Sequence, residues 1–130
     1  MLDLLSDAGL DLVEKKDFIP GLPRAFRFRD ASFGEREEAI HRNKDCGHLV
    51  CRCEQVSEEE VRSAIRRGAH TLDGVKQLTR AGMGRCQGGF CGPWVLKLLS
   101  AELGVAPEAI TRKGRRSEEV IAWDRPEAER

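Results

Sequence analysis

Four cysteines of this chain occur as two closely spaced pairs, and this pattern constrains the fold more than any other feature. The first pair is Cys51-Arg52-Cys53, and the second consists of Cys86 and Cys91, with four residues between them. Residues 54–85 separate the pairs and contain no cysteine. A fold that brings the pairs together creates a site with four sulfur ligands, which suits either a zinc ion or an iron–sulfur cluster.

The surroundings of the pairs favour a [2Fe–2S] cluster. Glycines crowd the second pair, where they let backbone N–H groups approach and donate hydrogen bonds to anionic sulfur without an intervening Cβ. Three nearby arginines, Arg52, Arg80 and Arg85, are expected to stabilise the more negative reduced form. The helix expected near Pro93 directs its positive end at Cys91. The glycines are Gly82, Gly84, Gly88, Gly89 and Gly92.

Spacing alone leaves other uses of the cysteines open. Structural zinc sites are usually built from C-x2–4-C pairs, so a C-x-C is less typical of zinc, but a zinc site with four cysteine ligands remains the main alternative. Disulfides or free thiols are further alternatives. His48 and Cys46 lie close to the first pair. We expect a surface histidine and a bystander thiol, with a role as a substitute ligand left open for each.

Composition excludes several classes of protein. Lys and Arg number 22, as do Asp and Glu, and this zero net charge argues against a polyanion-binding module. No apolar run is long enough to span a membrane. Five cysteines is an odd number, which favours reduced thiols and a cytoplasmic location over a secreted disulfide framework. Neither a Ser/His/Asp set nor a carboxylate pair stands out, so this chain alone shows no catalytic site.

The pattern of apolar residues and caps predicts a mainly α fold, a small bundle of short helices around a four-cysteine cluster-binding loop, over residues 46–112. Ser57 with Glu60 forms a capping box, Thr71 caps a second helix, and Pro93 suits the first turn of a third. We expect these helices to end at glycines and a last helical turn to follow over residues 107–110. The glycines are Gly68, Gly82 and Gly104.

The flanks differ from this central part. Residues 1–45 are predicted to be an irregular α/β connector, with a short helix ending at Gly9 and a brief strand over Leu10–Val13. The alternation of Phe26 and Phe28 with arginines predicts an edge strand, and Ser32 begins a helix through about Arg42. Residues 113–130 form a charged tail, which we expect to be mobile or ordered only against a partner.

Two stretches carry a resemblance to a known family. Residues 50–57, which read VCRCEQVS, resemble the start of the bacterioferritin-associated-ferredoxin-like (BFD-like) [2Fe–2S]-binding domain. Residues 71–76 and 79–91 resemble one branch, the C-terminal domain of FAD-dependent glycerol-3-phosphate dehydrogenase-like oxidoreductases. The resemblance covers residues 47–112, and residues 14–20 and 23–28 resemble the connector that precedes the domain in that branch.

The resemblance implies that Cys51, Cys53, Cys86 and Cys91 hold a [2Fe–2S] cluster. It implies an electron-transfer role, in which electrons pass from a flavin to a quinone or carrier protein. FAD would then sit on a catalytic domain or subunit that this sequence lacks, so the chain would be the C-terminal piece or a shortened version of a dehydrogenase. Peripheral membrane contact through that enzyme is left open. The alternative function is a structural or partner-docking domain with zinc or no metal.

Overall fold

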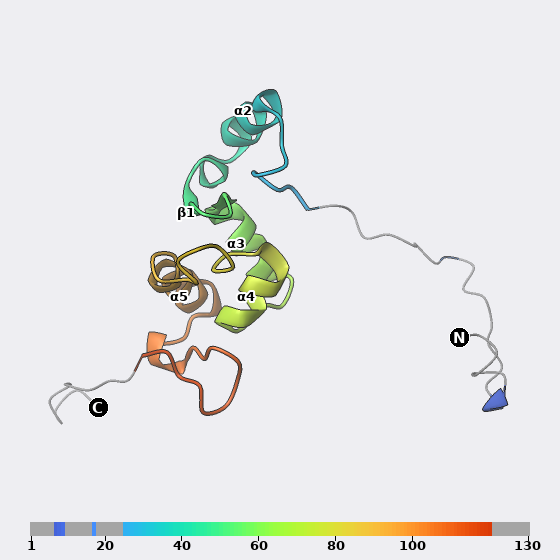
Figure 1. The fold of residues 1–130 in the computed structure, drawn as a ribbon, viewed down its shortest axis with the longest axis vertical. Helices are drawn as coiled ribbons and strands as arrows, with labels where there is room; N and C mark the ends of the chain where they lie inside the picture. The colour runs from blue at the N-terminus through green and yellow to red at the C-terminus, as the bar shows by residue number, and fades with distance from the viewer. Residues whose placement is uncertain (1–6, 10–16, 18–24, 121–130) are drawn as a thin grey trace, which may run out of the picture.

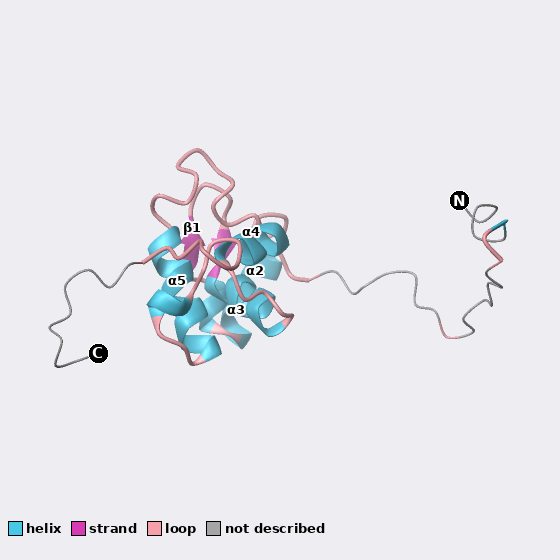
Figure 2. Cartoon of the chain, turned by 90° about the horizontal axis from the view of Figure 1, so that it is seen from below, coloured by secondary structure: helices cyan, strands magenta, loops and turns pink. Residues whose placement is uncertain are grey.

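A computed structural model describes residues 7–9, 17 and 25–120, and its body is built mostly of short helices (Figure 1). The predicted mainly α class is confirmed. Two very short strands accompany the helices (Figure 2). In chain order the elements are α2 (Phe33–Arg42), the 3-10 turn η1 (Lys44–Cys46), β1 (Leu49–Cys51), β2 (Val56–Ser57), α3 (Glu58–Arg66), α4 (Leu72–Thr79), α5 (Gly92–Leu103) and the 3-10 turn η2 (Pro107–Ala109).

The predicted helix starts are confirmed, because each depends on residues only three positions apart. Ser32 and Ser57 each form a complete capping box with the glutamate three residues later. The Thr71 hydroxyl accepts a hydrogen bond from the Gly74 amide at 3.0 Å. Pro93 lies in the first turn of α5, as expected.

Helix ends were predicted less well. Gly104 ends α5 in the left-handed conformation, with φ of 65°, as predicted. Helix α4, however, ends at Thr79 rather than running to Gly82, and Arg80 takes the left-handed position with φ of 71°. The Thr79 hydroxyl accepts a hydrogen bond from the Ala81 amide and donates one to the Val75 carbonyl. These bonds of the Thr79 side chain end the helix before Gly82.

The predicted edge strand at Phe26–Arg29 is wrong. These residues have no strand partner in the described part of the chain, and the Arg27 carbonyl accepts the amides of Asp30 and Ala31 in a turn. Phe28 instead lies under the guanidinium of Arg36, 4.7 Å from its carbon to the ring centre. The alternating aromatic and arginine residues therefore belong to a turn, in which Phe28 makes a cation–π contact with Arg36. The expectations for the helix ending at Gly9 and for Leu10–Val13 fall largely or wholly outside the described residues.

The core lies between α3, α4 and α5. Val61, Val75 and Leu99 are fully buried in it, and Ile110 closes it from the segment after η2. Val61, Ala64 and Ile65 form the buried face of α3, and Val95, Leu98 and Leu99 that of α5. Leu78 of α4 is 40% exposed.

Part of the charged C-terminal segment folds back on the body. At the start of α4, the Leu72 amide donates a hydrogen bond to the Thr111 carbonyl, and the Asp73 amide donates one to the Arg112 carbonyl. Thr111 also pairs with Glu118 in a single antiparallel bridge, so residues 111–118 form a closed loop. Among the described helices, none has the length and apolar character needed to cross a bilayer.

Candidate metal centre

The two cysteine pairs lie on different pieces of backbone that meet at one place. Cys51 ends β1, which pairs with β2 in an antiparallel ribbon, and Cys53 lies in the turn between the two strands. Cys86 lies in the loop from α4 to α5, and Cys91 is the N-cap residue of α5. Of the first pair, Cys53 therefore lies in a loop, whereas Cys51 belongs to a strand.

The fold brings the thiols together across the pairs. The Sγ atoms of Cys53 and Cys86 are 3.9 Å apart. Cys51 is close enough to Cys91 for their side chains to interact. All five cysteines are free thiols. Each close contact thus joins one cysteine of the C-x-C to one of the second pair, although 33 positions separate Cys53 from Cys86.

Gly84 explains how the two loops approach so closely. A Cβ built on this residue would lie 2.3 Å from the Cβ of Cys53 and 3.4 Å from its sulfur. Carbon atoms that are not bonded rest about 3.5–4.0 Å apart, so no larger residue fits here without moving Cys53. The sequence places Gly84 among several loop glycines, and the structure shows that this one packs against Cys53 of the other cysteine pair.

Backbone amides of the second loop surround the Cys86 sulfur. Hydrogen bonds from the N–H groups of Phe90 and Gly88, with a smaller one from Gly89, lower the pKa of the Cys86 thiol. Such donors stabilise negative charge on sulfur, as a thiolate ligand requires. The donors include Gly88 and Gly89, two of the glycines expected to bring backbone N–H groups to sulfur.

Cys91 lies in contrasting surroundings. Burial, followed by the neighbouring Cys51, raises the pKa of the Cys91 thiol to about 11. Two neighbouring thiols that are buried away from solvent resist ionisation unless a cation binds beside them. A bound metal supplies that positive charge and deprotonates its thiol ligands.

The three arginines near the candidate ligands differ in their partners. Arg52 and Arg85 lie next to the candidate ligands and make no ion pair in the described part of the chain. Arg80 instead donates to the Glu54 carboxylate at 2.9 Å, and Arg29 donates to the same oxygen at 2.9 Å. The hydrogen bond from Arg80 lowers the pKa of Glu54. Glu54 was not predicted from the sequence, although its position directly after Cys53 was a signal.

His48 and Cys46 each have an environment that does not involve the four candidate ligands. The Nδ1 atom of His48 lies 2.6 Å from the Glu58 carboxylate, and its ring meets Trp94 edge to face at 5.2 Å. Cys46 is 6% exposed in η1, and burial, followed by the charge of Glu59, raises the pKa of its thiol. Their partners among the described residues do not include any of the four candidate ligands.

The arrangement of the four cysteines suits some metal groups better than others. In the described part of the chain, no three His, Cys, Asp or Glu side chains are grouped tightly enough to hold one ion. The thiols form two close pairs instead, Cys53 with Cys86 and Cys51 with Cys91. A [2Fe–2S] cluster takes two thiolates on each of two irons, so paired sulfurs fit it better than they fit a single zinc.

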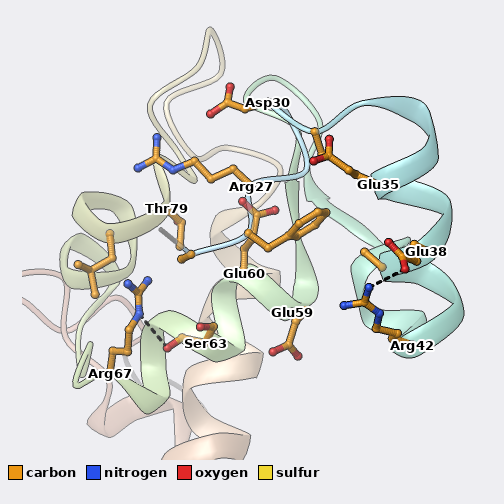
Figure 3. Close-up of a pocket in the computed structure, with 15 residues that line it drawn as sticks. Arg27, Asp30, Glu35, Glu38, Arg42, Glu59, Glu60, Ser63, Arg67 and Thr79 are labelled. Atoms are coloured by element: carbon orange, nitrogen blue, oxygen red, sulfur yellow. Dashed lines mark hydrogen bonds and ion pairs between the residues drawn. The ribbon is translucent and has the colours of Figure 1, made fainter. Parts of the chain in front are cut away.

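A separate cavity among the described residues lies away from the cysteines. It is an open groove of about 910 Å³ between the turn at residues 25–31, α2, α3 and the end of α4. Figure 3 shows its charged walls, where Arg42 pairs with Glu38 and Arg67 donates to the Ser63 carbonyl. The exposed Leu78 lines this groove. None of the five cysteines does, so the candidate metal centre is not a pocket of this kind.

A small helical body that brings together four thiols from two separate chain segments is typical of cysteine-ligated metal-binding domains. Residues 49–101 match the family model described as the BFD-like [2Fe–2S] binding domain. The resemblance found in the sequence is thereby confirmed. No solved structure gives a significant match to the chain.

Curated relatives match parts of the chain as well. The chain is 43% identical to a glycerol 3-phosphate dehydrogenase of Caloramator mitchellensis over 107 residues, which are 81% of this chain and 22% of that protein. It is 44% identical to an opine oxidase subunit of Rhizobium meliloti (strain 1021) over 55 residues, 42% of this chain and 12% of that protein. It is 36% identical to a subunit of an anaerobic glycerol-3-phosphate dehydrogenase of Haloferax volcanii over 58 residues, 45% of this chain and 10% of that protein. The chain thus spans only about a fifth of their lengths or less.

Proposed function

We propose that residues 46–112 are an electron-transfer domain that holds a [2Fe–2S] cluster through Cys51, Cys53, Cys86 and Cys91. The observation that carries this proposal is the meeting of the two cysteine pairs, with Cys53 and Cys86 3.9 Å apart at their sulfurs. The family match over residues 49–101 supports the choice of cluster. When bound, such a cluster accepts and releases one electron at a time.

The chain's own residues have distinct parts in this proposal. The four thiolates hold the group, and Gly84 leaves the space that lets the two loops meet. The amides of Phe90 and Gly88 stabilise negative charge at the Cys86 sulfur. Arg52 and Arg85 place positive charge beside the same site, which favours the reduced state and raises its potential.

The relatives support a proposal for the kind of enzyme that this domain serves. We infer that the domain serves a FAD-dependent dehydrogenase related to glycerol 3-phosphate dehydrogenases and opine oxidases. FAD and the substrate would bind to a catalytic domain or subunit, and the cluster domain would pass electrons on to a quinone or carrier protein. Residues 1–45 would connect the domain to that catalytic part, and residues 113–130 would form its tail.

Matched cysteine variants test the ligand assignment. The chain is purified without oxygen, and iron, acid-labile sulfide and zinc are measured per chain. The unmodified chain and Cys46→Ser should both contain two irons and two sulfides, because Cys46 contributes no ligand. Cys86→Ser should lose the cluster or carry an altered one with a changed EPR spectrum. One zinc per chain, or an equal loss of iron in Cys46→Ser and Cys86→Ser, would contradict the proposal and favour a structural domain.

A further inference from the structure

The four candidate ligands differ in their access to solvent. Cys51 and Cys91 are 2% and 3% exposed, and both belong to the hydrophobic core. Cys53 is exposed and Cys86 is half-buried. A protein that exchanges electrons with this site therefore comes closest to it on the side of Cys53 and Cys86.

Phe90 stands on this same side. Its backbone N–H donates to the Cys86 sulfur, so the residue lies directly at the site. Its side chain is 88% exposed, which makes it the most exposed large apolar side chain among the described residues. Aromatic residues are enriched at the centre of protein interfaces, where they fill pockets of the partner. An aromatic ring held at the open side of the site has the character of such an anchor.

Arginines complete this surface, which we call the thiol edge and define by Arg52, Cys53, Arg85, Cys86 and Phe90. Arg52 and Arg85 are each adjacent in sequence to a candidate ligand, and neither is paired with a carboxylate in the described part of the chain. A four-thiolate [2Fe–2S] centre is itself negative and repels an acidic protein. Guanidinium groups at its rim offset this repulsion and can bind carboxylates through two parallel hydrogen bonds.

We propose that the thiol edge is the docking surface for an acidic one-electron carrier protein, whose carboxylates surround an apolar pocket. Phe90 enters the pocket, and Arg52 and Arg85 pair with the carboxylates. One electron then passes from the reduced domain to the oxidised carrier, with no bond made or broken and no proton transferred between them. The inference rests on the proposed function, because the carrier is defined by the electron that it receives.

The test uses the anaerobically purified chain with its iron and sulfide content measured, and a flavodoxin as the acidic carrier. Binding is followed by isothermal titration calorimetry and by amide shifts in NMR spectra of the flavodoxin. Phe90→Ala keeps the backbone amide that bonds Cys86, and it should weaken binding by about tenfold or more. The double variant Arg52→Glu/Arg85→Glu should weaken it similarly and reduce its dependence on salt.

Two control variants share the chemistry but lie away from the thiol edge. Phe33 is 84% exposed at the start of α2, and Arg115 is exposed in the loop of residues 111–118. Phe33→Ala and Arg115→Glu should leave binding unchanged. No binding of flavodoxin to the cluster-loaded chain, or equal losses in the controls, overturns the docking proposal and leaves the cluster assignment standing. Absence of iron and sulfide overturns the proposed function instead.

Discussion

Replacing Gly84 with alanine is expected to disturb the metal centre directly. The new Cβ would lie 2.3 Å from the Cβ of Cys53 and 3.5 Å from its Cα. The two Cβ atoms must separate by roughly 1 Å or more to reach ordinary contact, since such atoms rest about 3.5–4.0 Å apart. Gly84 is not among the glycines with positive φ, so the effect comes from this contact and not from backbone strain.

The magnitude follows from the contact. Forcing an extra methyl group into a packed position typically costs about 1–3 kcal/mol in unfolding free energy. In a small domain, each kcal/mol lowers the melting temperature by about 4–8 °C. Functional groups must also keep their places to within about 0.5 Å, and Cys53 cannot do so here. We therefore expect Gly84→Ala to lower both the melting temperature and the cluster content.

The assay combines thermal unfolding, followed by circular dichroism, with iron and sulfide analysis after anaerobic reconstitution. Gly34→Ala is the matched control, because Gly34 lies inside α2 with no atom within 4 Å of an added Cβ. This control should be stabilised by up to about 1 kcal/mol through its helix propensity and should keep its cluster. If Gly84→Ala retains the cluster and stability of the unmodified chain, the close approach of the two loops is wrong.

Three further predictions concern parts of the chain around the site. Ser57→Ala should lower the unfolding free energy by about 1–2 kcal/mol in urea titrations, because it removes a buried capping box; Ser32→Ala, at an exposed box, should have a smaller effect. Cys46 should resist iodoacetamide in the native chain at neutral pH, because burial raises the pKa of its thiol; rapid alkylation would contradict its placement in η1. Burial alone would raise the pKa of Glu58, but hydrogen bonds from His48 and Arg62 outweigh it, so the pKa lies below the ordinary 4.5. The ion pairs of Glu58 therefore stabilise the fold above pH 4.5, and this stabilisation is lost as the pH falls through the lowered pKa. Glu58→Gln should flatten the acid unfolding curve in this pH range, and an unchanged slope would refute the role of these ion pairs.

The sequence predicted those features that depend on near neighbours. The capping boxes at Ser32 and Ser57 need only residues three positions apart, and Gly104 ends its helix through its own backbone freedom. The four candidate ligands were recognised because they occur as two short-range pairs. The sequence could not show that Cys53 meets Cys86 rather than Cys51, since the contact joins positions 33 residues apart.

Long-range contacts account for the main errors as well. Glu54 binds Arg80 and Arg29 across 26 and 25 positions, so Arg80 acts as a structural ion-pair partner at the end of α4. The alternation at Phe26–Arg29 has the period of a strand, but no second strand lies beside it among the described residues. Periodicity shows which residues could share a face, whereas the presence of a partner is decided by the rest of the fold.

Mössbauer spectroscopy of the anaerobically purified, iron-57-labelled chain tests the central claim most directly, because it counts and types the iron held by the four thiolates. The account predicts two sulfur-ligated ferric sites in an antiferromagnetically coupled pair when oxidised, with one becoming ferrous on one-electron reduction. A spectrum of mononuclear iron, or an iron-free chain with one zinc bound by the same cysteines, would contradict it.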